Sequence, residues 1–537
     1  EKDEFNPIAS GLKFYEIAFS FENSKTYSFP AGEPEPGEIC YIETVVVGRS
    51  TTQSSQFHIS INDVFDTTIS IAAVPSQYFS PYGREALFRK FLPLTSPTIN
   101  INLTFIRPDG NATGLLDYIL INARSRLRYS GNLLYIRDKK TEFQNVKLVI
   151  ETSQPLIIWD VTNIYNVMEQ QSVFTGSSQE FAVNNDRKVF VAFTLNNVKS
   201  ILYGKRINNQ NLHSISPSTL VIVSAPELKE KAQELADYHR SNGISTLLVT
   251  SEECYNEFSG GAINPMGIRF FLKMLYDKAM TANYPDTPRY LLLIGDGSYD
   301  NKNLMKLNRG AIIPTYQTLN SLDPLSSYVS DDFYSYLDDN ESDNPFDLRD
   351  IATARIQAQT ITDLSTYIEK LRKYKEPQNF GEWTNKVTIV GDDEDNNLHL
   401  GQADSLARFL LKNSRPFIVK KIYLDYYQEV LSGGGQRYPD VNKEIIKHIG
   451  ELGSVLFSYA GHGGEQGLAH ERILGLNDIL SFNNDCRLPI SATFTCSFTR
   501  FDKPDIISVG DYALFQRNGG FIVLVSTTRL VLSLIHI

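Results

Sequence analysis

The sequence predicts a multidomain protein, in which an N-terminal all-β domain precedes an α/β domain made of two α/β subdomains. The chain has 537 residues, more than one hydrophobic core usually supports. Short alternating stretches fill its first part without a clear helical pattern, whereas apolar strands and amphipathic helices alternate in the rest. We expect a β-rich domain at 1–205 and α/β subdomains at 215–375 and 376–537.

The expected β-rich domain is a series of short strands separated by Pro, Gly, Asn and Ser turns. The alternation of apolar and polar residues is clearest in CYIETVVVG, QFHISIN, TININLTFI and LLDYILINARSRLRY. Many short strands at this spacing are typical of a sandwich or a barrel.

The first α/β subdomain is expected after a turn-like stretch at 207–218. Its first strand, TLVIVSA, is continuously apolar, as in the buried strands of parallel sheets. An amphipathic helix follows and ends at Gly243. A second strand, a second helix and the strand RYLLLI come next, and the last of these runs into the acidic loop GDGSYD. This order predicts a parallel sheet with right-handed crossovers.

The second α/β subdomain repeats the pattern from the strand KVTIVGDD onwards. Two helices and the strand FIVKKIYLD lead to three further strands, SVLFSYAGHGG, LPISATFTCSF and GGFIVLVST. The sequence stops within the apolar stretch FIVLVSTTRLVLSLIHI, so we expect this subdomain to be incomplete at its C-terminal end.

Composition argues against several classes of protein. The net charge of −11 disfavours a general nucleic-acid binder, because phosphate contacts need a basic face. No apolar run reaches the roughly 18 residues of a membrane-spanning helix, and EKDEFNPIAS lacks the features of a signal peptide. The four cysteines form no CxxC pair and are too few for a disulfide framework; they are Cys40, Cys254, Cys486 and Cys496.

Two residues with catalytic chemistry follow strands of the second subdomain. His462 comes directly after SVLFSYAG, and Cys496 directly after LPISATFT. Functional groups collect at the carboxyl ends of strands in open α/β sheets. A thiol, whose unperturbed pKa is about 8.5, becomes a good nucleophile once an imidazole takes its proton. The N–H groups of Gly463 and Cys496 would be the donors of an oxyanion hole. Each residue alone is more often structural, whereas for the pair a catalytic and a structural interpretation are about equally supported.

The segments FSYAGHGGEQGLAHERIL and LPISATFTCSFTRFDKP resemble the catalytic core of the C25 (gingipain) cysteine peptidases, whose sheet is caspase-like. The resemblance implies that Cys496 is the nucleophile, His462 the general base, and the N–H groups of Gly463 and Cys496 the oxyanion hole. CYNEFSGGAINPMGIRFFLKMLYDKA, LLLIGDGSYDNKN and YVSDDFYSYLDD are more similar to the sortase branch of this family, which serves type IX secretion, than to the digestive gingipains.

The sortase resemblance implies a protein at the outer face of the outer membrane of a Bacteroidetes-type bacterium. Such an enzyme removes the C-terminal signal domain of secreted proteins through a Cys acyl-enzyme and transfers the acyl group to an amine of anionic lipopolysaccharide. It works beside an outer-membrane β-barrel partner of the PorV type. Two alternatives remain open at this point: a secreted endopeptidase that only hydrolyses, and a non-catalytic surface binding module.

Other acidic residues are weaker candidates. Asp331 and Asp332 fall where gingipains place acidic residues that orient the His or line the first specificity pocket, although a solvated loop explains either one as well. Two further loops cluster carboxylates with Asn and Gly, which suits Ca²⁺; their residues are Asp296, Asp300, Asp392 and Asp393. The proposed chemistry requires no cofactor. His399, His448 and His470 are more typical of helix or loop residues than of a second base.

Overall fold

The computed structural model describes residues 2–531, except for 20–21, 35–36, 94–95, 201–203, 205, 283, 342–346, 414–415 and 433–434. The chain divides into two compact units. The first, which we call the β unit, contains residues 15–74 and 83–209. The second, the α/β unit, contains the chain from Gln210 onwards and two short segments from the N-terminal part, 3–14 and 75–82.

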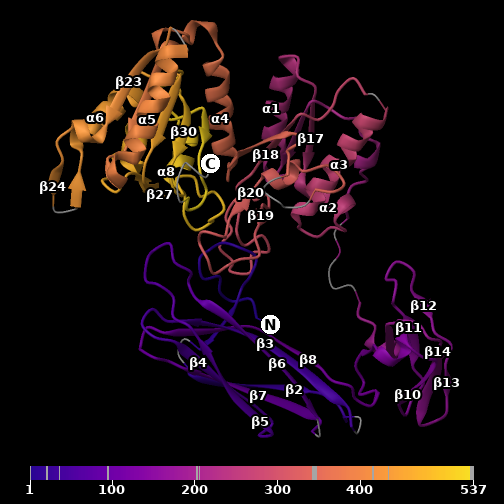
Figure 1. Ribbon diagram of the computed structural model, residues 1–537. Coiled ribbons are helices and arrows are strands. Elements are labelled where there is room, and N and C mark those ends of the chain that lie inside the picture. The colour runs from indigo at the N-terminus through magenta and orange to yellow at the C-terminus, as the bar shows by residue number, and fades with distance from the viewer. Residues whose placement is uncertain are drawn as a thin grey trace. The chain divides into compact units, whose positions relative to one another are not determined.

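The β unit contains two four-stranded antiparallel sheets (Figure 1). One sheet has the order β1 (Glu16–Phe19), β8 (Thr113–Asn122), β3 (Ile39–Arg49) and β6 (Arg84–Pro93). The other has the order β2 (Ser24–Pro30), β7 (Thr98–Ile106), β4 (Ser55–Ile61) and β5 (Phe65–Ile71). Alternate residues of β4 are buried, and Phe57 packs in one apolar cluster with Val46 of the other sheet. The two sheets therefore pack face to face, as in a sandwich.

Two smaller antiparallel sheets complete the β unit. The first consists of β10 (Val146–Glu151), β14 (Ser178–Val183) and β13 (Val173–Phe174). The second consists of β12 (Met168–Glu169), β11 (Ile157–Asp160), β15 (Phe190–Phe193) and β9 (Leu134–Ile136). Residues of both sheets share a separate apolar cluster, in which Phe181 meets Phe190 edge-on.

The α/β unit begins with a lobe built on a four-stranded parallel sheet. Its order is β17 (Thr246–Thr250), β16 (Leu220–Ser224), β18 (Tyr290–Ile294) and β21 (Ala352–Ile356). The helices are α1 (Lys229–Ser241), α2 (Ser251–Phe258), α3 (Pro265–Ala282) and α4 (Ile361–Tyr374). A hairpin of β19 (Tyr316–Gln317) and β20 (Val329–Ser330) lies in the long connection from β18 to β21. Every residue of β16 is buried, which explains its continuous apolar sequence.

The second lobe contains a five-stranded parallel sheet. Its order is β23 (Ile418–Tyr423), β22 (Lys386–Gly391), β26 (Leu456–Ala460), β30 (Ile490–Phe494) and β31 (Val523–Val525). The helices are α5 (Glu394–Asn413), α6 (Pro439–Ile445), α7 (Leu476–Ser481) and α8 (Val509–Phe515). Short strands form two small sheets, β24 (Val430–Ser432) with β25 (Gly435–Arg437), and β27 (Gly463–Gly464) with β28 (Gly467–Leu468) and β29 (Leu474–Gly475). A π-helical turn at Ile446–Glu451 extends α6.

The predicted fold class is confirmed, since antiparallel β sheets precede parallel α/β sheets. Two details differ from the expectations. The last predicted strand is short, because only Val523–Val525 pairs with β30. In addition, residues 3–14 and 75–82 belong to the α/β unit, although they lie in the predicted β-rich stretch. Among the described residues, no helix is both long enough and apolar enough to cross a membrane.

Candidate functional site

Three neighbouring strands of the second lobe end at the same edge of the sheet. Gly391 of β22 pairs with Ala460 of β26, which in turn pairs with Phe494 of β30. His462 lies two residues after Ala460, and Cys496 lies two residues after Phe494. Adjacent strands are only about 4.8 Å apart, so the equal offset places the two loops side by side. The Gly461 N–H also donates to the Phe494 carbonyl at 3.2 Å.

The backbone of His462 is held by two buried side chains. Its N–H donates to Asp392 Oδ2 at 2.8 Å, and its carbonyl accepts from the Tyr459 hydroxyl at 2.6 Å. Burial raises the pKa of Asp392, and the hydrogen bond from the His462 N–H opposes that shift in part. A Cβ on Gly461 would lie 2.4 Å from Asp392 Cβ and from the Tyr459 hydroxyl. Only glycine fits between these two groups.

The imidazole of His462 faces two carboxylates and two other imidazoles. Its Nε2 lies 3.0 Å from Asp395 Oδ2 and 3.4 Å from Glu394 Oε2. The His399 ring meets it edge-on and the His470 ring stacks on it. Burial lowers the pKa of His470, but the hydrogen bond that its ring donates to Glu394 outweighs this effect, so the net shift is upward. These carboxylates can orient the His462 ring and stabilise its protonated form.

The two carboxylates reach His462 because β22 lies next to β26 and leads into α5. Asp395, Asn396 and Asn397 all have positive φ angles, so the chain kinks there before the regular part of the helix. Sequence reasoning did not single out Glu394 and Asp395. The sequence feature that could have indicated them is the acidic run GDDEDNN, whose carboxylates we had considered as calcium ligands.

The Cys496 thiol is partly buried beneath the end of the chain. The Val531 N–H donates to Sγ at 3.4 Å, and Sγ lies 3.5 Å from the Val531 carbonyl. Burial raises the pKa of the thiol, and the Val531 hydrogen bond opposes this shift. The next residue, Ser497, has φ 49° and donates its N–H to the Arg529 carbonyl at 3.2 Å. A thiol in this setting depends on a nearby base to lose its proton.

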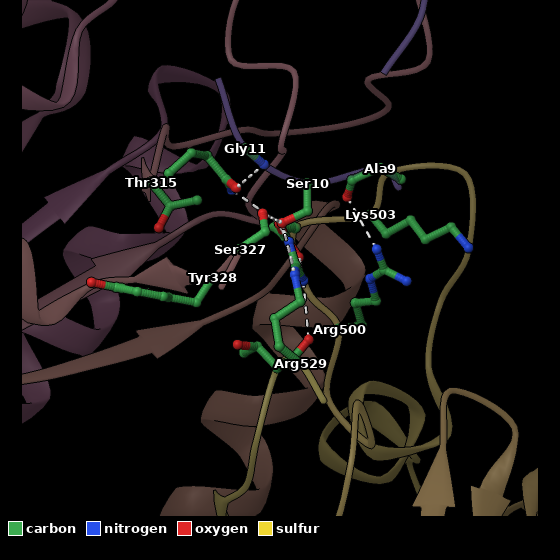
Figure 2. Close-up of polar contacts among 12 residues, drawn as sticks. Ala9, Ser10, Gly11, Thr315, Ser327, Tyr328, Arg500, Lys503 and Arg529 are labelled. Carbon is green, nitrogen blue, oxygen red and sulfur yellow. Dashed lines mark hydrogen bonds and ion pairs between the residues drawn. The ribbon is translucent and has the colours of Figure 1, made fainter. Parts of the chain in front are cut away.

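A buried polar network, which we call the arginine network, supports this loop (Figure 2). Arg529 Nη1 donates to Asp502 Oδ1 at 2.6 Å, and Arg529 Nη2 binds Asp502 Oδ2. Gln317 Nε2 donates to Asp502 at 2.9 Å, while its Oε1 accepts from the Gly11 N–H at 3.1 Å. Ser10 Oγ accepts from Arg529 Nε at 3.0 Å. Burial disfavours the charge on Asp502, but Arg529 outweighs it and lowers the pKa of that carboxyl.

The N-terminal segment is therefore part of the candidate site's scaffold. Arg500, four residues after Cys496, donates to the carbonyls of Ile8 and Ala9 at 2.9 and 3.1 Å (Figure 2). Its Nη1 also binds Glu465 at 2.7 Å. Nothing in the local sequence of this segment signals these contacts.

A second segment from the N-terminal part, 75–82, also reaches the site. The Tyr82 N–H donates to the Leu322 carbonyl at 2.7 Å. Tyr78 of this segment is 74% exposed. Its pKa is nevertheless raised, first by the part of the side chain that is covered and then by negative charge on Cys496 and Asp395. Sequence reasoning missed this residue too.

The expected oxyanion-hole donors lie at the same edge of the sheet. Gly463 opens β27, pairs with Leu468, and packs so closely on Thr495 that a Cβ would lie 2.5 Å from its hydroxyl. Gly463 therefore touches the residue directly before Cys496. The role of the Gly463 and Cys496 N–H groups as oxyanion-hole donors stays a prediction.

Asp331 and Asp332 have other partners. Asp331 accepts from Arg355 Nε and Nη2 at 2.7 and 2.8 Å and from Thr315 at 2.9 Å. Asp332 pairs with Arg349 at 3.1 Å. Arg355 is deeply buried, so Asp331 stabilises the first lobe by compensating its charge. The structure thus brings Asp395 and Glu394 to His462 rather than these two residues, whose part in catalysis or specificity stays a prediction.

The four carboxylates predicted for calcium lie on loops in two different lobes and already accept protein hydrogen bonds. Asp296 accepts from Gln359 at 2.6 Å, and Asp300 from two backbone N–H groups. Asp392 holds the His462 backbone, and Asp393 accepts from the Tyr438 hydroxyl at 2.6 Å. Calcium at these loops stays a prediction. The described groups of side chains that could hold a metal ion instead centre on His462.

Comparisons with known proteins identify the family of this chain and similar structures. Residues 213–536 match the model of peptidase family C25. The crystal structure of dimeric latent PorU from Porphyromonas gingivalis is 26% identical, with a TM-score of 0.62 over 71% of this chain and 38% of that chain. The Arg-specific cysteine proteinase gingipain R is 16% identical, with a TM-score of 0.44 over 60% of this chain and 65% of that chain. This chain therefore spans less than half the length of the PorU chain. No curated protein matches the sequence.

Proposed function

This chain belongs to peptidase family C25 and is a cysteine peptidase related to PorU; we propose that it is a sortase that removes the C-terminal signal domain of type IX-secreted proteins. The family resemblance is confirmed, and so is the predicted order of an all-β part before parallel α/β sheets. The observation that carries the catalytic part of the proposal is the equal offset of His462 and Cys496 beyond paired residues of β26 and β30. The similarity to PorU supports the sortase part.

In the proposed reaction, His462 accepts the proton of the Cys496 thiol, and the thiolate attacks the carbonyl at the junction with the signal domain. The N–H groups of Gly463 and Cys496 receive the negative charge of the tetrahedral intermediate. When the peptide C–N bond breaks, the imidazolium gives its proton to the leaving amine. The products are a free signal domain and a thioester on Cys496.

The second half of the reaction decides between transfer and hydrolysis. An amine of anionic lipopolysaccharide attacks the thioester, loses a proton to His462, and releases Cys496 as the thiol. Water is the competing acceptor, and its attack leaves a free carboxylate on the cargo. Asp395 and Glu394 support both halves because they lie within 3.4 Å of the imidazole, which is positively charged in each.

The proposed setting follows from the same relationship. We place the protein outside the cell, at the outer face of the outer membrane, with secreted cargo proteins as substrates and a PorV-like β-barrel as partner. The similarity to PorU supports this placement. Calcium at the loops of Asp296 and Asp392 is a secondary proposal, tested by comparing melting curves with and without a chelator.

The deciding experiment compares wild type with Cys496→Ala. Each is incubated with a cargo protein that carries its C-terminal signal domain, and the products are weighed by mass spectrometry. We expect wild type alone to release the domain and to leave added mass on the new C-terminus of the cargo. A free carboxylate instead would indicate a peptidase that only hydrolyses. Cargo left intact by both proteins would favour a surface binding module.

A further inference from the structure

Two further imidazoles lie beside the candidate base, and the proposed reaction uses neither of them. The ring centroids of His399 and His462 lie 5.2 Å apart, at an interplanar angle of 86°. Those of His462 and His470 lie 4.9 Å apart, at 16°. His399 comes from α5, whereas His470 comes from the loop after β28. Peptide-bond cleavage gives no reason for this cluster.

Two carboxylates each contact two of the three imidazoles. Asp395 Oδ2 lies 3.0 Å from His462 Nε2 and 3.3 Å from His399 Nε2. Glu394 Oε2 lies 3.4 Å from His462 Nε2 and 2.9 Å from His470 Nδ1. Two sets of three side chains result: Asp395 with His399 and His462, and Glu394 with His462 and His470. Within each set, the ligand atoms all lie within 4.8 Å of one another.

We propose that His399, His462 and Asp395 form a binding site for a divalent transition-metal ion, with Zn²⁺ as the best fit. Zn²⁺ binds imidazole nitrogen at about 2.0–2.1 Å and carboxylate oxygen at about 2.0–2.2 Å in tetrahedral geometry, so neighbouring ligand atoms lie roughly 3.4 Å apart. The contacts of 3.0 and 3.3 Å to Asp395 already approach this spacing. Three protein ligands leave a fourth position for water.

The set with His399 fits better than the set with His470. Both sets use His462 Nε2, so one ion can engage only one of them. The side chain of His399 is 11% exposed, whereas that of His470 is 65% exposed. Holding the buried side chain in place therefore costs less conformational entropy. His399 Nδ1 also contacts Gln402 Oε1 at 3.4 Å, which favours the tautomer whose Nε2 is free to bind metal.

Metal at this site would inhibit the peptidase. Coordination through Nε2 uses the single lone pair of the neutral His462 imidazole and leaves the proton on Nδ1, so neither ring nitrogen can accept the thiol proton. This consequence rests on the proposed role of His462, whereas the binding itself does not.

The binding test uses the full chain with Cys496→Ala, so that the candidate nucleophile contributes no ligand. Zn²⁺ is titrated in competition with a chromophoric chelator. We expect one tight site, and His399→Gln should weaken it by more than the roughly 10–100-fold that a lost outer-shell partner costs. His470→Gln is the matched control and should change the affinity little. Co²⁺ should give the absorption of a four-coordinate site, and His399→Gln should remove it.

Unchanged affinity in His399→Gln would overturn the proposal, and so would a loss of binding caused by His470→Gln alone. A second arm measures peptidase activity relative to the metal-free rate of each protein. Zn²⁺ should inhibit wild type reversibly and His399→Gln much less. If Zn²⁺ binds through His399 yet leaves the wild-type rate unchanged, the site stands and the assignment of His462 as the base fails.

Discussion

The nucleophile side and the base side of the candidate site are supported in different ways. Behind Cys496, the arginine network is almost closed to solvent, since Arg529 is 8% exposed and Asp502 is fully buried. The two carboxylates that contact the His462 imidazole are open, with 37% of the Glu394 side chain and 55% of the Asp395 side chain exposed. Both sides use ion pairs, but the pair behind Cys496 lies in a buried, low-dielectric region, whereas those at the His462 imidazole are exposed to water.

This difference has energetic consequences. Removing one member of a buried ion pair strands the other charge at a cost of about 3–5 kcal/mol, whereas exposed pairs contribute roughly 0–1 kcal/mol. The nucleophile loop should therefore be fixed by the fold. The imidazole should respond more readily to salt, charge and bound ions.

The largest effect should come from breaking the arginine network. Arg529→Met removes the partner of Asp502 and leaves its charge buried, so we expect a loss of about 3–5 kcal/mol in the free energy of unfolding. Denaturant titration measures this loss. Arg408→Met is the matched control, because Arg408 pairs with Asp404 on the surface of the same lobe; it should change stability by at most about 1 kcal/mol. Equal effects of the two substitutions would contradict the comparison.

The second effect concerns pH on the nucleophile side. Asp511, at the start of α8, is buried, and burial is the main cause that raises its pKa to about 7. Between about pH 4 and 7 the native state keeps a proton that the unfolded chain has released, so stability should fall as pH rises, by up to about 1.4 kcal/mol per pH unit.

Asp511→Asn should flatten this fall in melting curves recorded from pH 4 to 7. Asp363→Asn is the control, since Asp363 holds the same capping position at the start of α4 but is only half-buried. If Asp363→Asn flattened the curve as much as Asp511→Asn, the effect would not come from burial.

The third effect tests the N-terminal segment. Ser10→Ala leaves Arg529 Nε without its buried acceptor, which should cost about 1–3 kcal/mol of stability. The Arg529 carbonyl also accepts a hydrogen bond from the N–H of Ser497, the residue after the nucleophile. We therefore expect kcat to fall while KM stays the same. Ser241→Ala, at an exposed serine that bonds only locally, should change neither quantity. A stable Ser10→Ala protein with full kcat would show that the segment does not position the nucleophile loop.

The sequence predicted the elements of the site better than its contacts. The strands that end at the site are rich in apolar residues, and GHGG and the Cys after LPISATFT mark the two loops directly. The carboxylates near the imidazole could not be chosen this way. Which acidic run meets His462 depends on β22 lying next to β26, and the runs at 331–332 and 392–395 look alike in composition.

The contacts of the N-terminal segment could not be predicted from the sequence either. Ser10 and Arg529 are separated by almost the whole chain, and neither lies in a periodic pattern that predicts burial. The placement of 3–14 in the α/β unit comes from tertiary hydrogen bonds, such as those from the Leu12 N–H to the Thr318 carbonyl and from the Lys13 N–H to Ser321 Oγ. Local propensity carries no information on such pairings.

The smallest effect should come from the base side. Asp395→Asn removes one charge beside His462 but keeps an acceptor oxygen, and an exposed ion pair is worth at most about 1 kcal/mol. We therefore expect kcat/KM to fall by no more than about fivefold, measured with a chelator present. High salt should reduce the difference from wild type, because it screens exposed charges. Asp440→Asn, which removes an exposed charge paired with Lys443, should have no effect. A fall of several hundredfold that resists salt would mean that Asp395 acts in a closed, desolvated site, and the contrast between the two sides would then disappear.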